Sequence, residues 1–537
     1  MIYTTPLQAM TTSSNFCKSF AATPSHHLCT MMLFAFMVVF PSLGAWAGDI
    51  IVESDGSLND ALRQAREWRR TGDIRCTGGI RILVKAGRHR MEEPLFIRPE
   101  DSGSEDSPTL IIGEDGAVLC GDAPQRHTQL FPREGMGRII NFDKERRVIT
   151  IPTPPREVLR QKGVEMLLQQ RWAIAILRVK EMRVRGAQTD VTFLEPESRL
   201  EFEHPWPQPV VGGEKGNSAF LLRTTEQRDG IEQLVVVCGT EEHKVCHVTL
   251  QNLTFENTCW NRPLHKGHVT LQGGFPIIDA YKLQQEGLPW APTLENQAWI
   301  ERPVAAVSIS WVYQVNVKAC TFAHLASTAL DYHIGIDECE VSDCRFTDIG
   351  GTAILAGSFA ESPREVHRPY RDLAWLCDRL SIVNNHIEEA TTEDWGAVGI
   401  GCGYVTEVNI QHNTIDGVNY SGICVGWGWT PEDTGMTGNV ISNNTVRNYA
   451  RQLYDTGAIY TLSCQHWSLM EGNIISPHTP APYATNDRCF PIYLDAATDG
   501  YTIKENLLEG KGIITAEDIG FNNPGPTVHI IKSTKTE

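Results

Sequence analysis

The sequence predicts an all-β fold, a right-handed parallel β-helix that carries an N-terminal capping helix and an inserted subdomain. Two repeating patterns predict it. A polar-Asn-x-aliphatic pattern recurs after residue 245, and a second strand-like pattern recurs between its copies. Each unit contains short β-branched segments broken by Gly, Asn and Asp, with no room for a helix. This excludes leucine-rich and helical repeats and leaves a parallel β-helix.

The first pattern ends on an apolar anchor residue in each copy. The steps between successive anchors are 67, 24, 41, 28, 31, 29 and 33 residues, and five of the seven lie between 24 and 33. That spacing is typical of a solenoid whose units stack, and the two long steps contain insertions at 260–300 and 359–378. The recurring asparagine predicts a ladder of stacked side-chain amides. The anchors are Phe255, Phe322, Phe346, Ile387, Ile415, Val446, Ile475 and Leu508.

The second pattern predicts one further strand per coil, with a groove on its outer face. Its copies are aligned on Leu330, Ile354, Val398, Ile423, Ile459 and Ile492. Strand side chains alternate between two faces, so residues beside these inward positions point outward. The outward residues are polar or aromatic and are interspersed with glycines, which indicates a groove rather than a core. They are Asp331, His333, Tyr460, Tyr493 and Asp495.

Ahead of the coils, Ser57 to Trp68 predicts an amphipathic helix that shields the open end of the β-helix, with Ser57 and Asp60 as a capping box. A long segment before residue 241 does not follow the repeat and indicates a packed insertion near the groove. The predicted organisation is a signal peptide at 1–47, an N-terminal cap and first coils at 48–124, an inserted subdomain at 125–240, the main parallel β-helix domain at 241–520 and a C-terminal tail at 521–537.

The first 47 residues have the features of a signal peptide. Met31 to Phe40 is an unbroken apolar run, too short for a comfortable membrane span, and the run Ala45 to Ala47 supplies the small residues of a cleavage site. We therefore expect an exported protein, periplasmic or extracellular, with no membrane insertion after cleavage. An uncleaved anchor is the alternative.

The net charge and the spacing of the cysteines limit the classes of partner, metal and cofactor that the sequence predicts. The chain has 537 residues and a formal net charge of -18, from 65 acidic and 47 basic side chains. An acidic surface repels nucleic acid and anionic membranes, which argues against both as partners, and a neutral or mixed glycan fits better than a highly charged uronan. The cysteines form no C-x-x-C pair and no zinc-type spacing, so the sequence predicts no metal and no cofactor.

Five segments of the predicted groove together resemble glycoside hydrolase family 141. They are LASTALDYH (325–333), EDWGAVGIGCGYV (393–405), YSGICVGWGW (420–429), YDTGAIYTLS (454–463) and PIYLDAATDG (491–500). The resemblance runs from about Gly56 to Gly510. It implies a β-helix enzyme of gut-type bacteria that acts on plant polysaccharides, a family in which fucosidase and xylanase activities are represented. It also implies hydrolysis by two aspartates, which fall here on Asp455 and Asp495.

Paired carboxylates suit this chemistry, because cleavage of a glycosidic bond needs a proton donor and a second carboxylate as nucleophile or base. The pair lies about 5–5.5 Å apart in retaining enzymes and about 6.5–9.5 Å apart in inverting ones, and neighbouring coils are about 4.8 Å apart. Along straight strands Asp455 and Asp495 would lie about 20 Å apart, so the chain must bend at Asp455 or after Asp495. Asp394, in the same column as Asp455, and its neighbour Glu393 are kept as the alternative partner. Either aspartate could instead cap backbone amides at a turn.

Further residues are candidates for substrate binding. Trp427 and Trp429, two apart on one strand face, suit a stacking platform for a sugar ring, or else simple packing. His333 and His466 could bind substrate or transfer protons, or be satisfied histidines with no such role. The candidate substrate-binding residues are Asp331, His333, Trp427, Trp429, Tyr460, His466 and Tyr493.

Three functions fit these observations. The leading hypothesis is a glycoside hydrolase that cleaves a complex, plant-type polysaccharide through paired aspartates. The second is a polysaccharide lyase, which needs a Lys or Arg base, whereas the predicted groove strands contain neither. The third is a non-catalytic carbohydrate-binding surface protein, because a fold alone does not determine function.

Overall fold

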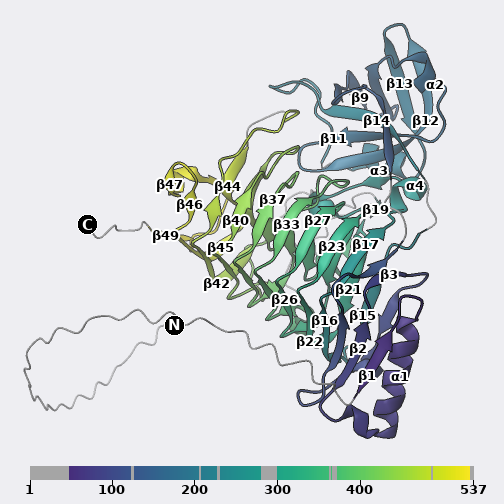
Figure 1. The fold of residues 1–537 in the computed structure, drawn as a ribbon. Helices are drawn as coiled ribbons and strands as arrows, with labels where there is room; N and C mark the ends of the chain where they lie inside the picture. The colour runs from purple at the N-terminus through teal and green to yellow at the C-terminus, as the bar shows by residue number, and fades with distance from the viewer. Residues whose placement is uncertain are drawn as a thin grey trace, which may run out of the picture. The chain divides into compact units, whose positions relative to one another are not determined.

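The computed structural model describes residues 48–531, apart from 122–125, 205–206, 227–229, 280–298, 362–363, 366–371 and 485–487. The described residues belong to one compact unit, Trp46–Glu537, and form a parallel β-helix, which confirms the predicted fold class (Figure 1). The predicted signal peptide lies outside the described residues. Within the described part, none of the helices combines the length and the apolar character needed to cross a membrane.

Three long sheets build the β-helix, and the chain visits them in turn. Strands within each sheet pair in parallel, except for the final antiparallel pair of β46 with β47. Sheet A contains β1 (Asp49–Val52), β2 (Ile80–Val84), β5 (Thr109–Gly113), β16 (Val245–Gln251), β22 (Val312–Lys318), β25 (Ile336–Asp337), β26 (Glu340–Ser342), β31 (Cys377–Asp378), β32 (Ser381–Val383), β35 (Val405–Thr406), β36 (Asn409–Gln411), β39 (Val440–Ser442), β42 (Cys464–Glu471), β45 (Asp499–Lys504) and β49 (His529–Ile531). Sheet B contains β3 (Gly87–Arg90), β6 (Ala117–Cys120), β17 (Thr254–Thr258), β23 (Thr321–Leu325), β27 (Arg345–Ile349), β33 (His386–Ala390), β37 (Thr414–Asp416), β40 (Thr445–Arg447), β43 (Ile474–Ile475), β46 (Leu507–Leu508) and β47 (Gly512–Ile513). Sheet C contains β4 (Leu95–Ile97), β15 (Val235–Cys238), β21 (Ala305–Ser310), β24 (Thr328–Tyr332), β28 (Ile354–Ala356), β34 (Ile400–Cys402), β38 (Ile423–Val425), β41 (Thr456–Thr461), β44 (Cys489–Leu494) and β48 (Ile519–Phe521).

Sheet C is the second strand pattern of the sequence, and its register is set by one buried aliphatic column. The aligned residue in β34 is Ile400, which pairs with Ile354 on one side and Ile423 on the other. The sequence alignment on Val398 was therefore wrong by two residues. In a regular strand, positions two apart share a face, so alternation of side chains alone does not distinguish them. Val398 lies ahead of β34 and packs in a different cluster from Ile400, together with Leu167 and Ile176. The column consists of Leu330, Ile354, Ile400, Ile423, Ile459 and Ile492, all with no exposed surface.

The predicted asparagine ladder is present. In each of four steps the side-chain amide of one asparagine donates to the side-chain oxygen of the next, at 2.8–3.0 Å. The same oxygens accept backbone N–H groups, and the amides also donate to backbone carbonyls. Buried polar groups need such partners, so the ladder holds neighbouring coils in register. Its members are Asn385, Asn413, Asn444, Asn473 and Asn506.

The predicted capping helix is α1 (Leu58–Thr71). The side chain of Ser57 accepts a hydrogen bond from the backbone N–H of Asp60, and Gly72 ends the helix in a left-handed conformation. Its buried face packs against the core of the first coils. The remaining helices are short: α2 (Arg156–Leu159), α3 (Glu197–Glu203), α4 (Arg262–Lys266) and the 3-10 helices η1 (Ile74–Cys76), η2 (Pro99–Asp101), η3 (Gln272–Gly274), η4 (Leu373–Trp375) and η5 (Ala516–Asp518).

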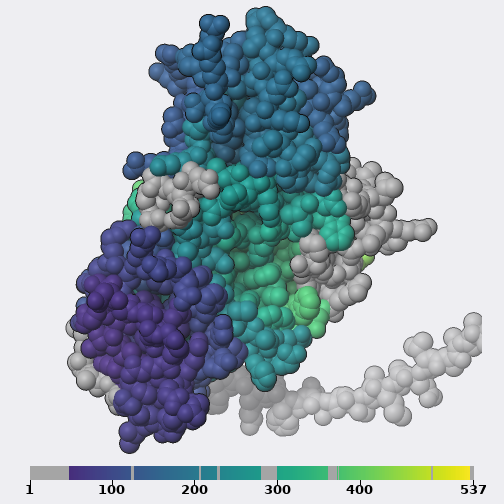
Figure 2. Space-filling view, turned by 90° about the vertical axis from the view of Figure 1, so that its right-hand side faces the viewer, coloured from purple at the N-terminus to yellow at the C-terminus, as the bar shows by residue number. Residues whose placement is uncertain are grey.

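A separate antiparallel sheet, here called the insertion sheet, interrupts the coils between β6 and β15. Figure 2 shows it in blue beside the teal and green coils. Arg223 attaches it to the coils, since its guanidinium donates to Glu165 of the insertion (2.6 Å) and to Glu393 of a coil (3.1 Å). The sheet contains β7 (His127–Phe131), β8 (Gly137–Arg138), β9 (Asn141–Asp143), β10 (Val148–Pro152), β11 (Val164–Gln169), β12 (Ile174–Arg185), β13 (Gln188–Phe193), β14 (Ala219–Thr225) and β18 (His268–Val269), and a small further sheet contains β19 (Ile277–Asp279), β20 (Trp299–Ile300), β29 (Ala360–Glu361) and β30 (Arg364–Glu365).

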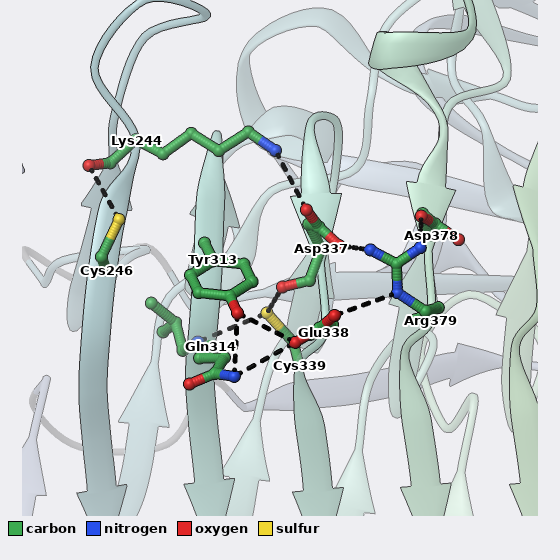
Figure 3. A network of polar contacts seen from close by, with 10 residues as sticks. Lys244, Cys246, Tyr313, Gln314, Asp337, Glu338, Cys339, Asp378 and Arg379 are labelled. Carbon is green, nitrogen blue, oxygen red and sulfur yellow. Dashed lines mark hydrogen bonds and ion pairs between the residues drawn. The ribbon is translucent and has the colours of Figure 1, made fainter. Parts of the chain in front are cut away.

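A network of polar side chains links successive coils beside sheet A (Figure 3). Arg379 forms ion pairs with Asp337 and, at 3.4 Å, with Glu338. The hydroxyl of Tyr313 donates to Glu338 at 3.0 Å, and Lys244 lies 3.9 Å from Asp337. These pairs are partly exposed, so solvent screens their charges and each contributes little to stability.

Candidate active site

A cavity of about 390 Å³ lies over the last coils of sheet C, and both Asp455 and Asp495 line it. We call it the carboxylate cavity. The tyrosines Tyr460 and Tyr493, from neighbouring strands β41 and β44, form part of its wall. Trp429 lines it as well, so the cavity brings together five of the residues predicted from the sequence.

The chain bends at Asp455, one of the two places at which the sequence predicts a bend. Asp455 directly precedes β41 and has a φ of 62°, in the left-handed region. Aspartate tolerates this conformation better than most residues, because its short polar side chain bonds locally. The bend turns the carboxyl group into the same cavity as Asp495, which follows β44.

The carboxyl group of Asp455 is mostly buried, with 17% of its side chain exposed. Its Oδ1 accepts a hydrogen bond from the Tyr493 hydroxyl at 3.1 Å and lies 3.4 Å from Nε of Arg488. Burial raises the pKa of Asp455 above its ordinary value. The charge of Arg488 and the Tyr493 hydroxyl oppose that rise, and the charge of Asp495 adds to it. The net effect favours the protonated form.

Asp495 has different surroundings. Its Oδ2 accepts hydrogen bonds from the Tyr460 hydroxyl and, at 3.3 Å, from the indole N–H of Trp429. Its Oδ1 accepts one from the side-chain amide of Asn522 at 2.6 Å. One cavity thus contains a carboxyl group whose pKa is raised by burial and a second one whose two oxygens accept three hydrogen bonds, an arrangement that suits acid-assisted displacement at a glycosidic carbon.

The structure does not bring Asp394 to Asp455. The two-residue correction of the register at β34 moves Asp394 out of the column, and its Oδ2 lies 2.8 Å from Nε2 of buried His268 instead. Burial lowers the pKa of His268, although the neighbouring carboxylate opposes this. Asp394 lines a second cavity, the α4 cavity, whose other residues include Arg262, His265, Lys266, Ser327, Gly351 and Ala397.

Asp331 and His333 also lie away from the carboxylate cavity. The carboxylate of Asp331 accepts two hydrogen bonds from the guanidinium of Arg302, at 2.7 and 2.6 Å, and is buried. His333 lines a small separate cavity next to Arg302, and burial together with the charge of Arg302 lowers the pKa of His333 to about 2. The prediction that these side chains face an open groove overlooked Arg302, which covers Asp331.

Neither tryptophan forms an open stacking platform. Trp427 is 3% exposed and packs against Phe275 and Phe359, with ring centroids 5.7 and 4.9 Å away. Trp429 reaches the carboxylate cavity, where its indole N–H bonds to Asp495. His466 is on β42 in sheet A, with its ring nitrogens 3.4 and 3.8 Å from the sulfur of Cys464.

Sequence reasoning missed the residues that complete the carboxylate cavity. Arg171 and Trp172 come from the turn between β11 and β12 of the insertion sheet, and Gln272 comes from η3. Arg488 immediately precedes β44, so its closeness to a predicted groove strand could have been recognised from the sequence. Two arginines therefore line the cavity, so the absence of basic residues from the groove strands was not sound evidence against a lyase. In the described part of the chain, no cluster of three or more His, Cys, Asp or Glu could hold a metal ion.

Comparisons with known proteins bear on the chemistry. A family model described as the GH141 insertion domain matches residues 121–228. A solved structure described as a glycoside hydrolase is 32% identical, covers 90% of this chain and 96% of its own, and has a TM-score of 0.82. The complex of XylC with xylose (12% identity, coverage of 90% and 71%, TM-score 0.41) and an alginate lyase from Paenibacillus sp. str. FPU-7 (9% identity, coverage of 90% and 99%, TM-score 0.39) are too distant for any inference. No curated protein matches the chain.

Proposed function

Because the chain belongs to glycoside hydrolase family 141, we propose that its carboxylate cavity is the active site and that Asp455 and Asp495 cleave the glycosidic bond. The observation that carries the proposal is that two carboxyl groups in contrasting surroundings line one cavity. Its volume, about 390 Å³, lies within the usual range of ligand sites, about 300–1,000 Å³.

Asp455 acts as the general acid. Its raised pKa keeps a proton available for the leaving-group oxygen, and the Tyr493 hydroxyl, itself 2.5 Å from Nη2 of Arg488, orients the group. Proton donation by such a group contributes about 10²–10⁴-fold to the rate.

Asp495 acts as the nucleophile or the base. Three donors hold its two oxygens, which fixes the carboxylate and compensates its negative charge in a largely buried site. Preorganisation of this kind removes the need to rearrange solvent as the oxocarbenium-like transition state forms.

We further propose that the substrate is a complex plant-type polysaccharide. The family resemblance of the groove segments supports this. A cavity whose wall alternates tyrosine and tryptophan rings with charged and amide groups also suits the mixed apolar and hydroxyl surfaces of sugars.

Turnover of a panel of plant glycans tests the proposal. New reducing ends are expected, whereas unsaturated ends would indicate a lyase and binding without turnover would indicate a surface protein. Asp455→Asn and Asp495→Asn should each lower kcat by at least about a hundredfold while folding is retained, since only proton transfer or charge is removed. Full activity in Asp455→Asn would exclude the mechanism.

Two further aspartates serve as comparisons in the same experiment. Asp348→Asn is the matched control, because Asp348 also has a left-handed backbone (φ 53°) but lies on the exposed surface. Its turnover should be unchanged. Asp394→Asn should cost activity only mildly, and a near-complete loss would instead favour Asp394 as the partner of Asp455.

A further inference from the structure

The α4 cavity has no assigned role. It measures about 230 Å³ and lies over β24, β28 and β34 of sheet C, whereas the carboxylate cavity lies over the later strands of the same sheet. From β28 to β41 there are three strand spacings, or roughly 14 Å. The two cavities are therefore neighbours along one face of the β-helix.

Small side chains create the floor of the α4 cavity. Ser327, Gly351 and Ala397 each stand three residues before a member of the buried aliphatic column, ahead of three successive strands of sheet C. The next residue in this series is Tyr420, which lines the carboxylate cavity. One row of positions thus runs beneath both cavities.

The wall of the α4 cavity consists of paired charges. Arg302 is held by two hydrogen bonds to Asp331, Arg262 forms an ion pair with Glu301, and His268 is bonded to Asp394. Because partners fix these groups, they present donors and acceptors in set directions at little further cost in side-chain entropy. Sugar hydroxyl groups both donate and accept hydrogen bonds, so a neutral sugar matches a wall of mixed charge better than an anion or a cation does.

Only a short turn separates the two cavities. In η3, Gln272 lines the carboxylate cavity and Gly274 lines the α4 cavity. Gly274 has a φ of 79°, and a Cβ atom built on it would lie 2.8 Å from Oδ2 of Asp394, so a side chain here would displace the Asp394 carboxylate from the wall. The same turn therefore contributes one lining residue to each site.

We propose that the α4 cavity is a second carbohydrate-binding subsite, which holds a distal sugar of the glycan that is cut in the carboxylate cavity. This inference rests on the proposed function. A glycan long enough to reach both cavities is then cleaved with a higher kcat/KM than a short one. The exposed side chains of His265 and Lys266, on α4 at the edge of the cavity, contact the distal sugar.

The test compares oligosaccharides of increasing length, made by partial hydrolysis of the polysaccharide that the wild-type enzyme degrades. In wild type, kcat/KM should rise with length. The double substitution His265→Ala and Lys266→Ala should lower kcat/KM for the long oligosaccharides about tenfold, the effect of losing one hydrogen bond to a charged group, and leave the shortest cleaved substrate within about twofold. Ser327→Trp, which fills the cavity, should have the same effect.

Lys180→Ala is the matched control, since Lys180 is exposed on β12 and lines neither cavity. Calorimetric titration of the long oligosaccharide into Asp495→Asn, with and without the α4 substitutions, should show the same tenfold difference in Kd. If wild type degrades no glycan, the proposed function fails and the subsite with it. If the wild-type enzyme is active but its kcat/KM does not rise with oligosaccharide length, only the subsite is overturned. The same holds if this rise is unchanged in the double variant and in Ser327→Trp.

Discussion

Replacement of Arg223 by Met should loosen the insertion sheet from the coils. The Arg223 side chain is 8% exposed and joins Glu165, on β11, to Glu393, in the loop ahead of β34. Methionine fills a similar volume but leaves two carboxylates without their counter-ion. The turn that carries Arg171 and Trp172 follows β11 directly, so the wall of the carboxylate cavity should move as well.

Removal of one partner from a buried ion pair costs about 3–5 kcal/mol, because the other charge stays buried. Here Glu393 is 21% exposed and lies 2.8 Å from Nε2 of His127, which compensates part of that cost, so we expect the lower end, about 3 kcal/mol. Burial of the Glu393 carboxyl group acts to raise its pKa, but the charge of Arg223 acts in the opposite direction, and the pKa of Glu393 is lowered. Such a carboxylate stabilises the folded state above its unfolded pKa, about 4.3, and loses this contribution as pH falls through the folded-state value. The difference between wild type and variant should therefore be complete at neutral pH and shrink below about pH 4.

Hydrogen exchange of the β11 and β14 amides, melting temperature and turnover measure the effect. The triple variant Arg223→Met, Glu165→Gln, Glu393→Gln should recover stability relative to the single one, because it removes the uncompensated charges. Arg185→Met is the control, since Arg185 is 53% exposed and pairs with Asp190 within the insertion. Unchanged exchange and melting in Arg223→Met, or a triple variant no more stable than the single one, would refute the reasoning.

Three further outcomes are expected. Tyr493→Phe removes a hydrogen bond that lowers the pKa of Asp455, so this pKa should rise further and the alkaline limb of the kcat/KM profile should move to higher pH. The control Tyr501→Phe removes a buried core hydroxyl and should leave the profile in place. A move to lower pH in Tyr493→Phe would contradict the assignment of Asp455 as the acid. Asn444→Leu removes four buried hydrogen bonds to neighbouring coils, two to Asn413 and one each to Ile410 and Asn473, and should lower the free energy of unfolding in urea by at least about 3 kcal/mol, whereas an unchanged midpoint would show that the ladder is dispensable. We also propose export: amino-terminal sequencing of protein from the native host should find a start near Gly48 outside the cytoplasm, and an intact chain in the cytosol would disprove this.

The β-helix could be predicted from the sequence because its evidence is local and repeated. An asparagine column and alternating apolar positions mark each coil without knowledge of distant contacts. The error at Val398 has a physical reason. Alternation alone would place Val398 and Ile400 on one face of an extended strand, and the glycines on both sides of Ile400 provide no contrast in size. The pattern therefore could not show that Val398 precedes β34 and packs outside the core that contains Ile400.

Half of the carboxylate cavity could be predicted, and the other half depends on tertiary packing. Asp455 directly precedes one repeated strand and Asp495 directly follows the next, and the need for a bend beside one of them could be inferred from their offset. The contribution of Arg171 depends on docking of the insertion through Arg223 and Glu393, which are 170 residues apart. No periodic signal in the sequence reports such a contact.

The backbone of Asp455 affects how related sequences should be compared. At a φ of 62°, glycine, asparagine and aspartate are favoured over other residues, whatever the chemistry of the site. A relative that has lost catalysis would therefore still tend to keep an aspartate or asparagine in this column. Asp495 is not among the residues with positive φ, so the backbone imposes no such restriction there. An intact aspartate in the Asp495 column is consequently the better marker for separating active enzymes from inactive relatives.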